Sequence, residues 1–338
     1  MMVSQARNSL ILRAVVVAAL FLLLTSALSF AADQTALTWT QLQPTIAFPA
    51  RAGFAAAYDP VSTRVIVFGG YDANGQVYND TWTFDGNTWQ PITTTSAPSP
   101  RFGAAMAYDS NVGKLVLFGG AAGLNLLNDT WLFDGTTLQW TQAQTQHALP
   151  LTVHAMAFTD PNGHAAVFGG RGRQFYSRTT YRWTGTDWML ATITGSIFNS
   201  PYPRAGGVSV LDTLHNSVLV FGGLSDTWIT QNTWTWNDRW IRENPSRQPD
   251  TLYFTSGAFD PKLRKVIVFG GGSGGVDEDG TWAWNGSNWK LLAPLASPPA
   301  REQFGTVWDP ATHQFLIFGG LDFTSGQFFG DTWELSAK

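Results

Sequence analysis

The sequence predicts an all-β chain folded as a six-bladed β-propeller with four-stranded blades, because three of its features recur in six successive units. Gly-Gly pairs end apolar runs at intervals of 48 to 53 residues, a period typical of propellers and solenoids. A Thr-aromatic pair follows each diglycine, and a second Trp follows that pair in the first five units. The diglycines are Gly69-Gly70, Gly119-Gly120, Gly169-Gly170, Gly222-Gly223, Gly270-Gly271 and Gly319-Gly320.

Each unit contains four short predicted strands, which we name a to d in chain order. Strand a is a run of small residues such as 54–58, and an Asp-Pro or similar turn leads from it into strand b, which ends at the diglycine. Strand c carries the Thr-aromatic pair, as in Thr81-Trp82, and strand d carries the second Trp, as in Trp89. Small residues suit the crowded axis of a propeller and Trp suits its wider rim. We therefore interpret nearly all of the 16 Trp residues as core packing.

The last unit ends too soon after Trp333 to contain a strand d. Residues 37–42, Leu-Thr-Trp-Thr-Gln-Leu, match the d strands of other units, such as Gln139-Trp140-Thr141-Gln142. We expect this N-terminal strand to complete the last blade and to close the ring without an open edge. The predicted propeller covers residues 37–338, with blades at about 49–92, 99–143, 150–192, 202–243, 249–293 and 299–338.

Residues 1–31 have the features of a secretory signal peptide, with Arg7 and Arg13 around its start, an apolar run over 14–24 and small residues up to Ala31. The alternative is an uncleaved anchor, although the run is shorter than a spanning helix needs. Cleavage would release a secreted, periplasmic or cell-surface protein with no other membrane segment. The chain contains no Cys, so its stability must come from burial and ring closure. Without the two signal Arg residues the net charge is about −6 with no basic block, which argues against nucleic acid as a partner.

The order of these motifs resembles the kelch repeat, which also forms the central domain of galactose oxidase. The resemblance depends on an Arg after Pro before strand a, an apolar strand into Phe-Gly-Gly, an aromatic residue on strand c and a Trp on strand d. Two units depart from it, because Leu151 in unit three and Leu252 in unit five replace the Arg. We therefore interpret that Arg as a local brace and not as a shared catalytic group. It is present as Arg51, Arg101, Arg204 and Arg301.

Motifs for metal or cofactor chemistry are not found in the sequence. The tyrosine-cysteine copper site of the kelch-type oxidases would require a Cys. The five histidines are scattered, and Asp277-Glu278-Asp279 is interpreted as a solvated acidic loop. Asp80, Asp129 and Asp331 recur just before Thr-Trp, and we expect them to bond loop backbone. We predict no metal and no cofactor.

In kelch proteins that bind ligands, the residues just after the diglycine and just after the Arg line the mouth of the ring. Residues that differ between units at these positions are the better functional candidates, because repeated residues indicate scaffold. The alternative is a set of ordinary solvated loop residues. Transferred to this sequence, the resemblance implies a ligand-binding site at Tyr71, Phe102, Arg171, Arg173, Tyr253, Glu302 and Gln303.

Two functions remain open. The first is a monomeric, non-enzymatic binding module that recognises a protein or a glycan through the mouth. The second resembles the kelch-type mutarotases and epimerases that act on sialic acid without metal, which need an acid/base pair around a sugar. Arg171 and Glu302 would then face each other across the ring, because they belong to units three and six.

Overall fold

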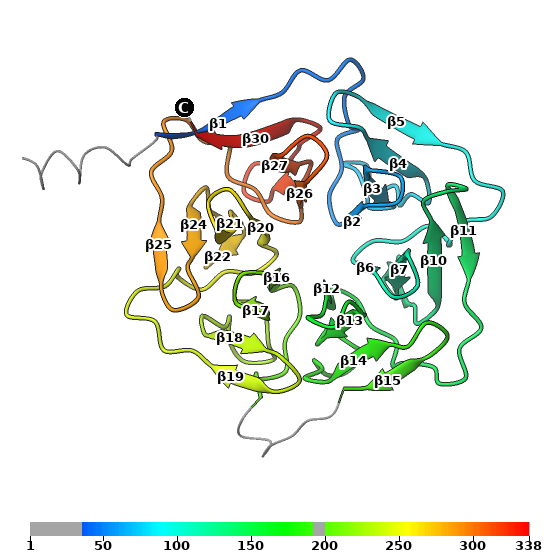
Figure 1. Cartoon of the computed structure of the whole chain (residues 1–338). Helices are drawn as coiled ribbons and strands as arrows, with labels where there is room; N and C mark the ends of the chain where they lie inside the picture. Colours follow the sequence, from blue (N-terminus) through cyan, green and yellow to red (C-terminus); the bar gives the residue numbers. More distant parts are fainter. Residues whose placement is uncertain (1–35, 192–199, 338) are drawn as a thin grey trace, which may run out of the picture. The chain divides into compact units, whose positions relative to one another are not determined.

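Six four-stranded antiparallel sheets stand around a central axis in the computed structural model of the protein (Figure 1). The structure describes residues 36–191 and 200–337. Strand a of every sheet faces the axis and strand d lies at the rim. The predicted fold class, an all-β propeller of six blades, is confirmed.

The blades follow each other in chain order around the ring. Blade 1 consists of β2 (Ala55–Asp59), β3 (Arg64–Phe68), β4 (Thr81–Phe84) and β5 (Trp89–Ile92), and blade 2 of β6 (Ala105–Asp109), β7 (Lys114–Phe118), β10 (Thr130–Asp134) and β11 (Gln139–Gln142). Blade 3 consists of β12 (Met156–Thr159), β13 (Ala165–Phe168), β14 (Thr180–Trp183) and β15 (Trp188–Leu190), and blade 4 of β16 (Val208–Asp212), β17 (Ser217–Phe221), β18 (Thr233–Trp236) and β19 (Trp240–Arg242). Blade 5 consists of β20 (Ser256–Asp260), β21 (Lys265–Phe269), β24 (Thr281–Trp284) and β25 (Trp289–Leu291), and blade 6 of β26 (Gly305–Asp309), β27 (Gln314–Phe318), β30 (Thr332–Ala337) and β1 (Leu37–Gln41).

The N-terminal strand β1 pairs with β30 and so completes blade 6, as the sequence predicts. Trp39 of β1 is buried, and its Nε1 donates a hydrogen bond to Oγ1 of Thr281 in blade 5 at 3.0 Å. The same Trp-to-Thr bond links other pairs of neighbouring blades. It joins Trp89 to Thr332, Trp140 to Thr81, Trp188 to Thr130 and Trp289 to Thr233, at 2.8 to 2.9 Å.

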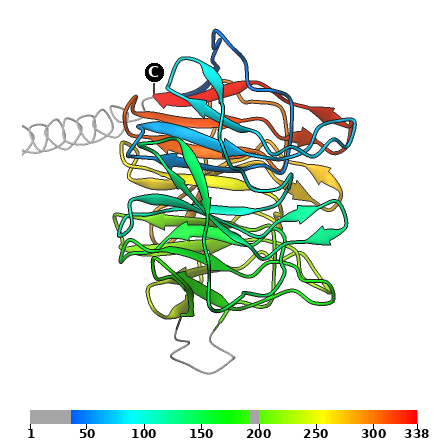
Figure 2. The ribbon, with the colours of Figure 1, turned by 90° about the vertical axis from the view of Figure 1, so that its right-hand side faces the viewer.

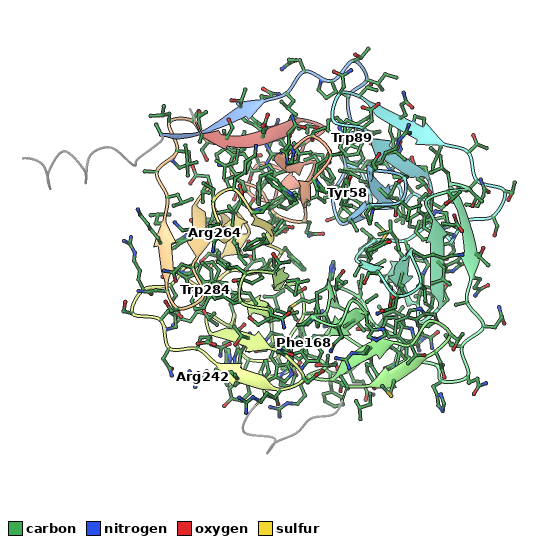
Figure 3. All side chains as sticks on the ribbon, viewed as in Figure 1. Tyr58, Trp89, Phe168, Arg242, Arg264 and Trp284 are labelled. Atoms are coloured by element: carbon green, nitrogen blue, oxygen red, sulfur yellow. The ribbon has the colours of Figure 1, made fainter. Side chains whose placement is uncertain are left out.

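Apolar side chains fill the space between neighbouring blades. Trp89 of blade 1, for example, packs with its ring centroid 4.8 Å from that of Phe318 in blade 6. Figure 3 shows the side chains between the sheets, with Trp284 and Phe168 inside the ring wall and Arg242 at the rim. Each sheet therefore depends on its neighbours for its core.

The connections between strands b and c all emerge on one face of the ring, which we call the mouth face. Three of them form small hairpins, β8–β9 (Ala121–Ala122 and Asn125–Leu126), β22–β23 (Gly272–Ser273 and Val276–Asp277) and β28–β29 (Leu321–Asp322 and Gln327–Phe328). Figure 2 shows these three hairpins on the same side of the ring. The turns between strands a and b lie on the opposite face. In each of these turns a buried Asp accepts backbone N–H bonds, namely Asp59, Asp109, Asp160, Asp212, Asp260 and Asp309.

The Arg before strand a is a buried brace, as the sequence predicts. Arg101 donates from Nη1 to the carbonyl of Gly119 at 3.0 Å, and both of its terminal nitrogens contact the Asp129 carboxylate at 2.7 and 2.8 Å. Arg51 and Arg301 make the same contacts with Asp80 and Asp331.

Two expectations about this brace are wrong. The residue that takes the place of the Arg in blade 3 is Thr152 and not Leu151, because the Thr152 carbonyl accepts from the second Gly of the preceding blade as the Arg101 carbonyl does. Among the described residues, the Asp side chains bond mainly to other side chains and not to loop backbone. They accept from the Arg and from the Nε1 of the Trp two residues later, at 2.7 Å.

A closed ring of six backbone hydrogen bonds surrounds the axis where the strands a begin. Each N–H donates to the carbonyl of the equivalent residue in the preceding blade, at 2.6 to 3.0 Å. The first blade closes the circle, because Gly53 N–H donates to the carbonyl of Gln303. The participants are Gly53, Gly103, His154, Gly206, Phe254 and Gln303. Their backbone fixes the geometry of the mouth.

Over the described residues there is no helix of the length and apolarity that crossing a membrane requires. The expected signal peptide, residues 1–31, lies outside the described residues.

Candidate functional site

The mouth of the ring is built by two sets of residues that pair across each blade. The residue after the brace position bridges to the residue after the diglycine, as in Ala52 with Tyr71 and Glu302 with Leu321. The other bridges are Phe102 with Ala121, Val153 with Arg171, Ala205 with Leu224, and Tyr253 with Gly272. The positions proposed from the sequence therefore lie on one face, close to the axis.

Three of the six residues in the hydrogen-bonded ring carry side chains in the left-handed conformation that favours glycine. Their φ angles are 54° at His154, 50° at Phe254 and 55° at Gln303. Gly53, Gly103 and Gly206 hold the equivalent places in the other blades. A non-glycine residue is strained there by about 1–2 kcal/mol, and such strain is concentrated at functional sites. These three side chains line the central channel, a cavity of about 190 Å³.

Glu302 is the buried acid of the mouth, with 3% of its surface exposed. Its Oε1 accepts from Nε2 of Gln303 at 3.2 Å, and Oε1 of Gln303 accepts from the hydroxyl of Tyr71 at 3.2 Å. The closed ring brings these residues together, because Tyr71 belongs to blade 1 and the other two belong to blade 6.

The pKa values of Glu302, Tyr71 and Tyr253 are all raised. Burial raises the pKa of Glu302 to about 7, and the nearby Asp277 carboxylate adds to the rise. Burial and the Glu302 charge also raise the pKa values of Tyr71 and Tyr253. Near neutral pH this part of the mouth can therefore both donate and accept protons.

Gly272 makes room for the approach of Tyr253 to Glu302. A Cβ atom at Gly272 would lie 2.5 Å from the ring of Tyr253 and 2.7 Å from Oε2 of Glu302. The absence of a side chain at this place after the diglycine is therefore what lets the phenol and the carboxyl converge.

A chain of aromatic contacts crosses the mouth from Tyr71 to Tyr253. The ring centroids are 5.5 Å apart for Tyr71 and Phe102, 6.2 Å for Phe102 and His154, 4.7 Å for His154 and Phe254, and 5.5 Å for Phe254 and Tyr253. Burial, with the Arg171 cation as a smaller cause, lowers the pKa of His154 to about 4. The imidazole is therefore neutral at pH 7 and acts as part of an aromatic surface.

The two cations lie in a separate part of the mouth. Arg171 and Arg173 line a cavity of about 520 Å³ between blades 2 and 3, together with Phe102 and the β8–β9 hairpin. The guanidinium of Arg171 lies 5.6 Å from the centroid of the Tyr176 ring. No hydrogen bond or ion pair connects Arg171 to Glu302 in the described part of the chain. The seven predicted residues thus lie on one face in two groups, one around Glu302 and one around Arg171. Phe102 contacts both groups, because its ring packs against Tyr71 and it lines the cavity of Arg171 and Arg173.

Large apolar side chains are exposed on the connections between strands b and c, which lie on the same face. We call them the hairpin-tip residues. Between 54% and 101% of their surface is exposed. They are Leu124, Phe175, Trp228, Val276 and Phe323, in blades 2 to 6.

Sequence reasoning missed His154, which it treated as one of several scattered histidines. A signal was present, because the second residue after the brace position is Gly in units one, two and four and a larger residue in units three, five and six. Among the described residues, no group of three or more His, Cys, Asp or Glu side chains is placed to hold a metal ion.

Comparisons with known proteins agree with this architecture. Residues 25–197 match the model of the KLHDC2/KLHL20/DRC7 Kelch-repeats domain. A solved structure titled "Structure of YjhT" superposes with a TM-score of 0.67 at 18% identity, covering 85% of this chain and 95% of the other. At this identity the likeness shows the fold alone. No curated protein sequence gives a significant match. The family match extends over half of the chain, and with the six repeated blades it establishes that this protein belongs to the kelch-repeat family.

Proposed function

We propose that this protein is an exported binding module that recognises a protein or glycan ligand through its mouth face. The observation that carries this proposal is the difference between the two faces. The turns of the opposite face repeat one arrangement, a buried Asp that caps the turn, in every blade. The mouth face differs from blade to blade and carries the five hairpin-tip residues, which include the most exposed large apolar side chains of the described chain.

The chemistry of the mouth favours an amphipathic ligand that carries a carboxylate. Arg171 and Arg173 offer planar arrays of donors that match a carboxylate. The aromatic chain from Tyr71 to Tyr253 offers flat surfaces for a sugar ring or an apolar side chain. An acidic sugar and the acidic end of a peptide share this chemistry.

The proposal is tested in two steps, first by screening the full protein on a glycan array and against a displayed peptide library. The affinity of the selected ligand is then measured for three variants. Arg171→Ala and Glu302→Gln should each weaken binding about tenfold or more, because each removes a charge-assisted hydrogen bond. Asp260→Asn, in a turn of the opposite face, should leave the affinity unchanged. Binding that is lost in Asp260→Asn and kept in both mouth variants would show that the site lies on the face opposite to the mouth.

A second candidate function is favoured by the environment of Glu302. A carboxyl with a pKa of about 7 beside the Tyr253 phenol can serve as a general acid and base, which is what a metal-independent sugar mutarotase or epimerase needs. Exchange NMR on the anomers of acidic and neutral sugars tests this function. Catalysed exchange that Glu302→Gln abolishes would favour an enzyme over a binding module.

The proposed site of action is outside the cytoplasm, and the pattern from Arg7 to Ala31 supports it. N-terminal sequencing of the accumulated protein should give a start near Ala32. An intact Met1 in a membrane fraction would show that the segment is an anchor.

A further inference from the structure

The brace position of blade 3 differs from that of blade 1 in three residues at once. In blade 1 the guanidinium of Arg51 lies between the Tyr78 ring, at 4.2 Å, and the Asp80 carboxylate. Backbone bonds to the diglycine identify the equivalent residues of blade 3, because Ser177 N–H donates to Gly170 as Tyr78 donates to Gly70. The Thr179 carbonyl likewise accepts from Gly169 as that of Asp80 does from Gly69. Thus Thr152, Ser177 and Thr179 stand where blade 1 has Arg, Tyr and Asp.

The three smaller side chains leave a cavity. Its volume is about 370 Å³, within the range of small-molecule sites in proteins. Thr152, Gly169, Ser177 and Thr179 all line it, so it occupies the place that the guanidinium fills elsewhere. Its other walls are mainly apolar and aromatic, with the charged Arg178 among them, and include Leu149, Leu151, Phe175, Tyr176 and Tyr181.

Two polar groups at this cavity lack a hydrogen-bond partner among the described residues. The hydroxyl of Thr152 is buried without a hydrogen bond, and 7% of the residue is exposed. The carbonyl of Gly169, whose equivalents Gly69, Gly119, Gly222 and Gly319 accept from the brace Arg, receives no donor from any residue that the structure describes. A buried hydroxyl without a partner is unfavourable. A ligand that bonded the Thr152 hydroxyl and the Gly169 carbonyl would remove this cost and gain a second hydrogen bond.

We propose that this cavity in blade 3 binds an uncharged aromatic molecule that carries an O–H or N–H donor, of the phenol or indole class. The donor bonds the Gly169 carbonyl, the Thr152 hydroxyl supplies a second hydrogen bond, and the ring packs against Tyr176 and Tyr181. The site lies beside the mouth, because Gly172 lines both this cavity and the one at Arg171. Its polar groups are not those of the mouth, and it does not depend on the function proposed above.

The groups in the lining explain the choice of an uncharged ligand. Of the described residues that line the blade 3 cavity, none carries a carboxylate and Arg178 carries a positive charge, so a bound cation would lack the partner that Asp80 provides to Arg51. A carboxylate ligand would lack the donor that the Gly169 carbonyl needs. Blade 5 offers the contrast. There Leu252 and Gly280 replace the brace pair, and a cavity of about 440 Å³ is lined by the acidic residues Asp250, Glu278 and Asp279.

Calorimetric titration of the full protein with matched small molecules tests the ligand class. Phenol and indole should bind saturably at one site, and toluene and benzoate at least fivefold more weakly because they lack the donor. Benzamidine should bind more weakly than phenol because the cavity offers its cation no carboxylate. Thr152→Val keeps the side-chain shape, removes the hydroxyl, and should weaken phenol about fivefold. Toluene binding as tightly as phenol, or benzamidine binding more tightly, would overturn the proposal.

Restoring the brace tests the location. In the double variant Thr152→Arg with Thr179→Asp, saturable phenol binding should disappear while the melting temperature stays at or above that of the parent. The matched control, Leu252→Arg with Gly280→Asp in blade 5, should bind phenol as the parent does. If the first double variant does not fold, Ser177→Tyr, which returns the ring of Tyr78, should also abolish binding. Phenol binding that persists in a folded variant with the cavity filled would show that the site is elsewhere.

Discussion

The indole Nε1 of Trp39 and the Oγ1 of Thr281 are separated by 242 residues in the sequence and by 3.0 Å in the fold. This bond joins the strand that begins the ring to the blade next to the one that it completes. Trp39→Ala should therefore lower the free energy of unfolding by about 3–5 kcal/mol, as other buried aromatic truncations do. Chemical denaturation measures the effect. Thr40→Ala, an exposed position of the same strand, should change stability by less than about 0.5 kcal/mol, and equal unfolding curves for Trp39→Ala and the parent would contradict closure by β1.

Arg204 is the brace that lacks a carboxylate. Its Nη2 donates to Oδ1 of Asn232 at 2.8 Å, where the other braces meet an Asp, and burial lowers its pKa to about 9. Asn232→Asp should raise the free energy of unfolding by about 1–3 kcal/mol, because it gives a buried cation its counterion. Thermal and denaturant unfolding would measure the gain. The same substitution at Asn125, which is exposed on β9, should have almost no effect, and a less stable Asn232→Asp protein would contradict this account.

Glu302 should make stability depend on pH. Because burial raises its folded pKa to about 7, the folded protein keeps a proton that the unfolded chain, at about 4.5, has already released. Stability from this group therefore falls as pH rises from about 4.5 to 7 and is constant above that window. The loss is on the order of 3 kcal/mol. Unfolding measured at pH 5 and pH 8 should show a smaller difference for Glu302→Gln than for the parent. Glu243→Gln, at the rim, should leave the difference unchanged.

The left-handed positions of the hydrogen-bonded ring should separate stability from function. His154→Gly relieves backbone strain, so it should change stability by no more than about 1 kcal/mol while weakening ligand binding at the mouth. Gly103→Ala should destabilise the protein by about 1–3 kcal/mol, because a Cβ atom there would lie 2.5 Å from Val153 and would take the strained conformation. Denaturation and a binding assay on the same samples test both. Unchanged binding in folded His154→Gly would remove His154 from the site.

The fold could be predicted because every unit repeats the same periodic pattern, so errors in one unit are corrected by the other five. The interpretation of Trp39 as part of the last blade succeeded for the same reason. The candidate site depends on residues that break the repeat, and their partners come from other blades. The contact of Tyr71 with Gln303 joins blade 1 to blade 6 and arises only when the ring has closed, and the approach of Gly272 to Glu302 joins blade 5 to blade 6. Neither contact has a local sequence signal.

The error at Leu151 has a physical reason too. Without the Arg, no charged residue marks the brace position of unit three. Which residue occupies it is decided by a backbone hydrogen bond, from Gly120 N–H to the Thr152 carbonyl, that cannot be recognised in the sequence. Leu151 was therefore assigned to the position that Thr152 holds, and the cavity that Thr152 lines could not be anticipated.

The ring of six backbone hydrogen bonds around the axis has an electrostatic consequence. All six peptide groups point the same way around the circle, so their dipoles follow one another head to tail and their sum cancels. A helix end presents partial charge to a ligand because its dipoles are aligned, whereas this circle presents none, and each of its N–H groups is already occupied. The polarity at the channel entrance is therefore set by the side chains at three places, now His, Phe and Gln. Related chains could change what enters by exchanging these three residues while the backbone circle stays the same.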